Sequence, residues 1–466
     1  MGSLHIETEL AVIGSGPGGY VAALRAADLG KEVVIIEERE ELGGVCLIEG
    51  CIPSKALINV VDLMHATDKA ARMGLSFGER SVDLAKLREW TASVVDGLTG
   101  GVRGLLKKRG VEVIHGRASF DSNSILRLDG GSVVDFKECI IATGSSINTL
   151  PDSIDLPLWS SAEALKLPEI PKRLVVVGGG YIGLEMGMVY AGLGSEVTVV
   201  EFFPRLLMGA DRDLVDVMVK YSENHFKALL TESKVQKIEK NGKGYIVNIM
   251  HNGKANKIET DQVLVAIGRK PNTGNIGLEN TNIILDEHGL IQVTPEGRTA
   301  EQNIFAIGDV TPGPALAHKA SREGKVVAEV LANHHSQFDN RAIPAVVFTD
   351  PEIAWAGLTE MEAEKEGMKV NVGKFPLRAL GRAATMGRTD GLVKVISDPD
   401  TDLVLGVGMV GPHVSELIAE GTLAIEMGAT LEDLMVTIHP HPTLSEALME
   451  AAEVAAGSPV HINPKK

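Results

Sequence analysis

The sequence predicts an α/β protein with two Rossmann-like dinucleotide-binding domains and an α+β region at the C-terminus. Two glycine-rich loops carry the first part of this prediction, because Gly14–Glu37 and Gly178–Glu201 repeat the same spacing of glycines and a final acid. The third observation is the region after residue 343, where strand-like and helix-like runs alternate without such a loop. A length of 466 residues leaves room for about three domains.

The first predicted fold begins with an apolar strand over Thr8–Ile13, followed by a Gly-x-Gly-x-x-Gly loop and a helix over Tyr20–Leu29. A second strand, Lys31–Ile36, leads into an acid. In such a fold the glycines form the turn, admit a pyrophosphate and pack helix on strand, while the acid binds ribose hydroxyls. We therefore expect one dinucleotide on Gly14, Gly16, Gly19 and Glu37.

The second fold follows a proline-bounded linker, Pro168–Pro171, and repeats the pattern with strands over Leu174–Val177 and Glu196–Val200. The expected ligand set is Gly178, Gly180, Gly183 and Glu201. An oxidoreductase with two such folds typically holds one flavin and one nicotinamide. The acid at the second ribose site would repel a 2′-phosphate, which favours NAD over NADP.

A pair of cysteines follows the first fold's second strand. Cys46 and Cys51 are separated by four residues, and Pro53 and Lys55 come directly after them. Proline fits the first turn of a helix, so Cys51 is expected at a helix N-terminus, where the thiolate is favoured. The other readings are two ordinary thiols or half of a zinc site, but the third cysteine, Cys139, is far away in sequence. We therefore expect a redox dithiol and no metal.

Three more apolar runs end in glycine, as at the carboxyl ends of parallel strands: Ile141–Gly144, Val265–Arg269 and Ile304–Asp309. Asp309 is an acid at such an end and could bind sugar hydroxyls. The residues alone leave a second interpretation open, in which Asp309 caps a helix or holds a turn.

The C-terminal region begins after a second linker, Ser336–Pro344. The strands expected there are Ala345–Phe348, Gly391–Ile396 and Leu403–Val410, and the helices are Val414–Met427 and Thr443–Ala456. Gly428 suits the C-terminal end of the first of these helices.

Two histidines precede the last predicted helix. Thr443 and Glu446 have the spacing of a capping box, which explains those two residues but neither His439 nor His441. A histidine oriented by a carboxylate is the usual general acid–base near neutral pH, and a dithiol needs a proton acceptor. The residues alone do not choose between the two histidines.

Bulk properties exclude several classes of partner. The chain has 45 basic and 62 acidic residues, a net charge of −17, so binding to nucleic acid or to an anionic membrane is not expected. We find no continuous run of about 18 apolar residues that would predict a transmembrane helix. Met1–Glu9 lacks the features of a signal peptide, and only 3 cysteines fit a reducing compartment. A cytoplasmic location is therefore expected.

Over essentially its full length, the chain resembles the two-cysteine flavoprotein disulfide reductases, and most closely the members that oxidise dihydrolipoamide. The motifs that carry the resemblance are Gly43–Lys55 around the dithiol, Leu316–Ala320, Val347–Glu352 and His441–Glu446. The family's architecture implies an FAD domain (1–149), an NAD domain (150–270), a central domain that completes the FAD site (271–342) and a dimer-interface domain (343–466).

The resemblance also implies roles. Cys46 would exchange with the substrate and Cys51 would face the flavin, while Lys55 would pair with Glu185 nearby. His441, oriented by Glu446, would be the base and would come from the partner subunit. The implied cofactor-binding residues, for FAD and NAD together, are Gly14, Gly16, Gly19, Glu37, Lys55, Gly116, Gly144, Asp309, Ala317, Gly178, Gly180, Gly183, Glu201 and Gly268.

The reaction implied by the resemblance is oxidation of dihydrolipoamide with reduction of NAD⁺, in a homodimer. The substrate would be carried by a lipoylated protein, such as the acyltransferase of a 2-oxo acid dehydrogenase complex or a glycine-cleavage carrier. The family commonly has Asn where this chain has Ile48, and Glu49 is also unusual. This departure leaves an alternative, a related NAD(P)H-dependent flavoprotein reductase with another disulfide substrate.

Overall fold

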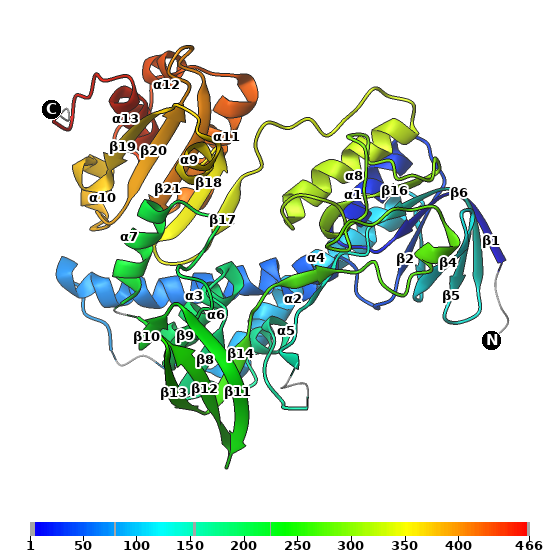
Figure 1. Cartoon of the computed structure of the whole chain (residues 1–466), viewed down its shortest axis with the longest axis horizontal. Helices are drawn as coiled ribbons and strands as arrows, with labels where there is room; N and C mark the ends of the chain where they lie inside the picture. Colours follow the sequence, from blue (N-terminus) through cyan, green and yellow to red (C-terminus); the bar gives the residue numbers. More distant parts are fainter. Residues whose placement is uncertain (1–4, 79–80, 152–154, 224, 464–466) are drawn as a thin grey trace.

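The computed structural model describes residues 5–78, 81–151, 155–223 and 225–463. The ends of the first and last expected domains, residues 1–4 and 464–466, lie outside these ranges. In Figure 1 a first α/β unit lies at the right, a second lies below the centre and the C-terminal unit lies at the upper left. The predicted fold class, two Rossmann-like sheets with an α+β C-terminal domain, is confirmed.

The first sheet has the strand order β3-β2-β1-β6-β5-β4, and a further strand, β16, pairs with β6. The strands β3, β2, β1, β6 and β16 pair in parallel, and β5 and β4 extend the sheet beyond β6 by antiparallel pairing. The bounds are β1 His5–Ile13, β2 Val33–Glu37, β3 Glu112–His115, β4 Ala118–Ser122, β5 Ile125–Leu128, β6 Val133–Ile141 and β16 Ile304–Ala306. Because β16 follows the second unit in sequence, the chain returns to complete the first sheet. Helices α1 (Pro17–Asp28) and α8 (Ala317–Leu331) pack together there.

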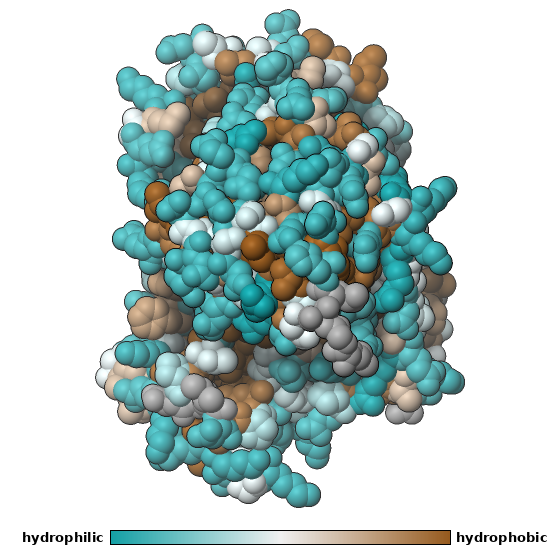
Figure 2. Space-filling model, turned by 90° about the vertical axis from the view of Figure 1, so that its right-hand side faces the viewer, coloured by the Kyte–Doolittle hydropathy of each residue, from teal (hydrophilic) through white to brown (hydrophobic). Residues whose placement is uncertain are grey.

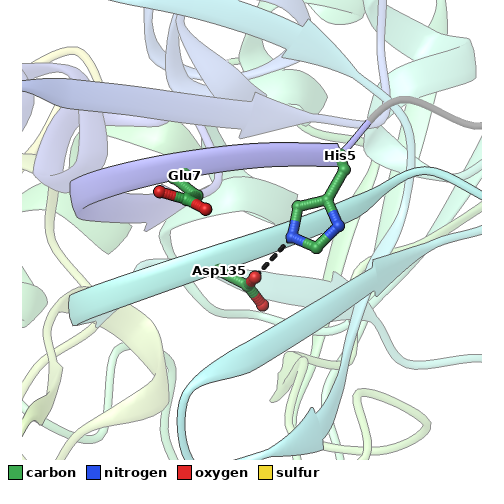
Figure 3. Close-up of side chains that lie close together, drawn as sticks. All are labelled: His5, Glu7 and Asp135. Carbon is green, nitrogen blue, oxygen red and sulfur yellow. Dashed lines mark hydrogen bonds and ion pairs between the residues drawn. The ribbon is translucent and has the colours of Figure 1, made fainter.

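The register of β1 and β6 places two acids side by side, because Glu7 lies directly opposite Asp135. His5 lies two residues before Glu7 on the same face of β1, and its Nε2 atom hydrogen-bonds the Asp135 carboxylate (Figure 3). The His5 ring therefore lies beside both acids of this strand pair.

The second unit has a parallel sheet of order β10-β9-β8-β14 against a three-stranded antiparallel sheet, β11-β12-β13. The bounds are β8 Arg173–Val177, β9 Glu196–Val200, β10 Ala228–Leu230, β11 Ser233–Asn241, β12 Gly244–His251, β13 Lys254–Thr260, β14 Gln262–Val265, α6 Tyr181–Gly192 and α7 Arg212–Ser222. Buried Val175, Val263, Tyr245 and Ile249 join the two sheets. A short ribbon of β7 (Ser145–Ile147) and β15 (Arg269–Pro271) connects this unit to the first.

The C-terminal unit is a five-stranded antiparallel sheet, β17-β18-β21-β20-β19, covered by helices. The bounds are β17 Ala345–Val347, β18 Glu352–Gly357, β19 Asn371–Pro376, β20 Leu392–Ser397, β21 Val404–Gly411, α9 Glu360–Glu366, α10 Gly381–Thr385, α11 Val414–Met427, α12 Leu431–Val436 and α13 Glu446–Ala455. Helix α11 has the predicted bounds. The expected start of the last helix is wrong, because the Thr443 hydroxyl donates to the Pro440 carbonyl instead of capping α13.

The dithiol segment forms two consecutive helices. They are α2 (Gly44–Glu49) and α3 (Cys51–Ala70), and the remaining helices are α4 (Leu84–Lys108) and α5 (Ser161–Leu165). By length and composition alone, the stretch Gly44–Met73 would be able to cross a membrane, which the sequence analysis did not expect. A mostly buried core helix passes the same test, and here 28% of the apolar window is buried. In this structure α3 packs on α4 and α6, and a cytoplasmic location stays a prediction.

Two clusters of ion pairs fix the C-terminal unit to the rest of the chain. Asp350 accepts from Arg388, and Lys69 near the end of α3 approaches it to 3.3 Å. Burial alone would raise the pKa of Asp350, but hydrogen bonds and cations around it hold that pKa well below its usual range. In the second cluster the fully buried Lys394 ammonium lies 2.6–2.8 Å from three carboxylates, those of Asp211, Asp213 and Glu360. The Lys374 ammonium lies 2.7 Å from two of these carboxylates, those of Asp213 and Glu360, so the acidic cluster has two cations.

Candidate active site

The first glycine loop has the geometry that a dinucleotide requires. A side chain at Gly14 would meet the Ala142 carbonyl at 2.4 Å, and one at Gly19 would meet the Gly14 carbonyl at 1.9 Å, so both positions exclude a Cβ. The middle glycine, Gly16, faces open space instead. Open space at the N-terminus of α1 is where a pyrophosphate binds in this motif.

The second loop repeats this geometry. A Cβ at Gly178 would lie 2.2 Å from the Ala266 carbonyl, one at Gly183 would lie 2.1 Å from the Gly178 carbonyl, and Gly180 faces open space. At the end of β9, the Glu201 carboxylate accepts from the Gly179 and Phe203 amides. The two loops therefore present the same kind of site, one on each Rossmann-like sheet.

A cavity of about 870 Å³ runs along the first loop to the dithiol. It is lined by most of the residues expected at the flavin: Gly14, Gly16, Glu37, Cys46, Cys51, Lys55, Gly116, Gly144, Glu185, Asp309 and Ala317. Gly19 lies beneath the loop, where it allows the close approach of helix and strand. Gly178, Gly180, Gly183, Glu201 and Gly268 do not line this cavity and belong to the second unit.

The two cysteines are free thiols with different environments. Cys51 is the first residue of α3, as the sequence predicts, and is exposed, whereas Cys46 is half-buried in α2. A hydrogen bond from Cys46 lowers the pKa of Cys51 to about 7, and the charge of Lys55 acts in the same direction. The same hydrogen bond and burial raise the pKa of Cys46. Cys51 is therefore the thiol of this pair that is ionised near neutral pH.

Lys55 and Glu185 form the expected ion pair at 2.7 Å, with the Glu185 side chain only 4% exposed. The other oxygen of Glu185 accepts from the Phe348 amide at 3.0 Å, and the Lys55 ammonium lies 4.5 Å from the centre of the Phe348 ring. Phe348 was predicted from the sequence only as part of an interface-domain motif, not as part of this site. One carboxylate thus connects α3, α6 and the C-terminal unit beside Cys51.

Asp309 lies in a short 3₁₀ turn after β16, and its carboxylate accepts from the Ser145 hydroxyl at 2.5 Å. Arg269 donates to the same hydroxyl, so three strand ends meet at this point. Ser145 and Arg269 were not predicted as site residues from the sequence, although they directly follow the predicted glycines Gly144 and Gly268. On the opposite side, Gly116 donates its amide to the Glu37 carbonyl at 2.9 Å.

The structure distinguishes the two C-terminal histidines. The ring of His439 is 4% exposed, and its two nitrogens bond the Thr437 carbonyl and the Glu420 carboxylate. The ring of His441 is 77% exposed, and its Nδ1 lies 2.9 Å from Glu446. Among the described residues its Nε2 has no partner, which leaves it open to a substrate. Burial would raise the pKa of Glu446, but hydrogen bonds from Thr443 and His441 hold that pKa low.

The His441–Glu446 pair does not reach the cavity of its own chain. None of the residues that line the cavity belongs to the C-terminal unit, and Figure 1 shows this unit on the opposite side of the molecule from the first sheet. The structure therefore brings together the dithiol, the Lys55–Glu185 pair and the first nucleotide site, but leaves the histidine pair apart.

A dithiol beside one nucleotide site, with a second nucleotide site in the next domain, defines a nucleotide-dependent disulfide oxidoreductase. Two family models agree: that of the pyridine nucleotide-disulphide oxidoreductases matches residues 8–324, and that of their dimerisation domain matches residues 343–452. The chain belongs to the pyridine nucleotide-disulphide oxidoreductase family.

Its relatives narrow the class. Dihydrolipoyl dehydrogenase of Geobacillus stearothermophilus is 47% identical over the full length of both chains, and that of Bacillus subtilis is 44% identical over 99% of each. Among solved structures, LpdA of Mycobacterium tuberculosis has a TM-score of 0.87 at 27% identity, covering 96% of this chain and 99% of its own. The HOCl-induced flavoprotein disulfide reductase RclA of Escherichia coli has a TM-score of 0.84 at 28% identity, covering 94% and 98%.

Proposed function

We propose that the protein is an NAD-dependent dihydrolipoyl dehydrogenase, which oxidises protein-bound dihydrolipoamide to lipoamide and holds FAD as its cofactor. The observation that carries the proposal is the position of Cys51, a thiol with a pKa of about 7 that opens into the same cavity as the first glycine loop. Full-length relatives named dihydrolipoyl dehydrogenase support this substrate over other disulfides.

The first half of the reaction is thiol–disulfide exchange. His441 takes a proton from one thiol of dihydrolipoamide, and the resulting thiolate attacks Cys46 in the Cys46–Cys51 disulfide. The bond between the two cysteines breaks, and Cys51 leaves as a thiolate. Because a thiol of low pKa is a good leaving group, the pKa of about 7 at Cys51 favours this direction of attack.

The second thiol of the substrate then attacks the substrate sulfur of the mixed disulfide. The protonated His441 gives its proton to the departing Cys46 sulfur and takes the proton of the second thiol. Lipoamide is released with a new S–S bond, and Cys46 and Cys51 remain as the reduced dithiol. The buried Glu185 keeps the Lys55 charge beside Cys51, which stabilises its thiolate. Bound FAD would supply the two-electron redox chemistry that returns this dithiol to the Cys46–Cys51 disulfide and reduces NAD⁺.

The residues of both glycine loops fit these cofactors. FAD would lie along the first cavity on Gly14, Gly16 and Gly144, with Asp309 on its ribitol or pyrophosphate side and Glu37 at its ribose. NAD⁺ would lie on the second loop, with Glu201 on the ribose hydroxyls.

A homodimer would complete the site. The C-terminal unit matches the family's dimerisation domain, and it exposes Leu423, Met427, Val436 and Ile438, whose side chains are 61–95% exposed. Ile438 is only three residues before His441, so an interface that buries it would also hold the histidine. A second copy would then supply His441 to the dithiol of the first.

An NAD⁺ reduction assay on the purified yellow protein tests the proposal. We expect rapid NADH formation with dihydrolipoamide, little with glutathione, and a strong preference for NAD⁺ over NADP⁺. Cys46→Ser should abolish turnover while FAD stays bound. Absence of turnover with every lipoyl donor, in protein that holds FAD, would contradict the proposal and favour another disulfide substrate.

A further inference from the structure

Glu49, the unusual residue between the two cysteines, is paired with Arg39. It is the last residue of α2, and its carboxylate accepts a hydrogen bond from Arg39 at 2.6 Å. Both side chains are about one-third exposed or less, at 35% for Arg39 and 26% for Glu49. The carboxylate of this residue is therefore engaged by the loop after β2, although Glu49 and the two cysteines line the same cavity.

Arg39 belongs to the first nucleotide site. It lies two residues after Glu37, and its amide donates to the Glu37 carboxylate at 3.1 Å. The same carboxylate accepts from the amide and the hydroxyl of Ser15, at 2.8 and 2.6 Å, in the glycine loop. The Arg39 carbonyl is bonded by the His115 ring at 2.8 Å. The backbone of Arg39 is thus fixed beside the acid that would bind the adenosine ribose.

The ion pair borders the cavity. Arg39 and Glu49 both line it, together with Glu37, Gly116 and Arg117, whereas Lys55 and Arg269 lie toward the dithiol and Asp309. In a dinucleotide fold the residues just beyond the ribose-binding acid flank the adenosine. A guanidinium is planar, stacks on aromatic rings and is held well by a carboxylate, so an arginine fixed there suits a purine.

We propose that Glu49 is a positioning residue that holds the Arg39 guanidinium against the adenosine end of bound FAD. The inference rests on the proposed function only in taking FAD as the occupant of this cavity. The ion pair joins the loop after β2 to the last residue of α2. It therefore links the adenosine end of the cofactor site to the segment that carries the two cysteines. A partly exposed ion pair contributes little to the free energy of folding. We therefore expect loss of this pair to change the retention of FAD more than the stability of the chain.

The test measures the rate at which FAD leaves the holoenzyme after dilution, followed as the rise in free-flavin fluorescence. We expect Glu49→Gln and Arg39→Gln each to speed release by about 3- to 10-fold, the size of a single partly exposed charged contact. Because Glu49 acts through Arg39, the double variant should release FAD no faster than Arg39→Gln alone. Arg103→Gln is the control, since Arg103 donates to the nearby Glu40 carbonyl but does not line the cavity.

Three outcomes would overturn the inference. Unchanged release in Glu49→Gln would mean that Arg39 needs no support, and additive effects in the double variant would mean that the two residues act separately. A raised KM for dihydrolipoamide with unchanged FAD release would place Glu49 on the substrate side. The assay needs no lipoyl substrate, so protein that retains FAD but lacks lipoamide activity would refute the proposed function and leave this inference standing.

Discussion

The hydrogen bond from Cys46 is the first cause of the low pKa of Cys51, and a pair of variants can isolate it. Cys46→Ala removes the donor, while Cys46→Ser keeps an O–H at the same place. We expect the pKa of Cys51 to stay near 7 in the serine variant and to rise toward its ordinary value of 9.0 in the alanine variant. Lys55 remains in both variants, so part of the shift should persist.

The magnitude follows from the fraction of thiolate. At pH 7 a thiol with a pKa of about 7 is ~50% ionised, against ~9% at a pKa of about 8 and ~1% at about 9. Cys51 should therefore react with iodoacetamide about 5- to 50-fold more slowly in Cys46→Ala than in Cys46→Ser at pH 7. The difference should vanish above about pH 10, where both thiols are ionised.

The assay is alkylation of the holoenzyme across a pH series, with the labelled peptide identified by mass spectrometry. Cys139 is an internal control, because it is 0% exposed and its burial raises its pKa. Equal pKa values for Cys51 in the two variants would refute the role of the Cys46 hydrogen bond. Lys55 and the N-terminus of α3 would then account for the whole lowering of the pKa.

Three other predictions follow from the site and its supports. His441→Gln should lower dihydrolipoamide turnover by about 10²–10⁴-fold while NADH still reduces the flavin; an equal loss in His439→Gln alone would contradict the choice of base. Glu201→Ala should raise the KM for NAD⁺ by about 10-fold and reduce the preference for NAD⁺ over NADP⁺. An unchanged ratio of activity with the two nucleotides would mean that Glu201 does not bind the ribose. Lys394→Met should lower the free energy of unfolding by about 3–5 kcal/mol in urea titrations, because the buried Asp211 carboxylate loses its cation and the partly exposed Asp213 and Glu360 lose one of theirs. Lys374→Met is the control. Lys374 is half-exposed and bonded to two of those carboxylates, so its loss should lower the free energy of unfolding by less.

The sequence predicted the elements whose signal is local. The helix Val414–Met427 has its predicted bounds, since Gly428 ends it in the left-handed conformation that glycine favours. Cys51 opens α3 as Pro53 indicates. The β12–β13 hairpin was not predicted, although the sequence contains its signal. Asn252 and Gly253 form an Asn-Gly pair between the two strands, and both have the positive φ that such a turn requires.

The rest of the site could not be predicted because it depends on contacts between distant segments. Nothing near Glu49 in sequence shows that its partner is Arg39, ten residues earlier in the loop after β2. The Glu185–Phe348 contact joins residues 163 positions apart. The choice between His439 and His441 required the burial of one ring and the exposure of the other.

The helix α3 has a mechanical consequence. It begins at Cys51, and Lys69 near its other end reaches Asp350 of the C-terminal unit. Its 20 residues span about 30 Å as one rigid rod. The C-terminal unit contacts this rod in two places, Phe348 beside Lys55 and Asp350 beside Lys69, so the spacing of these contacts along the rod fixes the domain that would carry the histidine to a second copy. Adding one residue to the rod would turn one end by about 100° against the other, so this spacing tolerates substitutions on the helix surface far better than insertions.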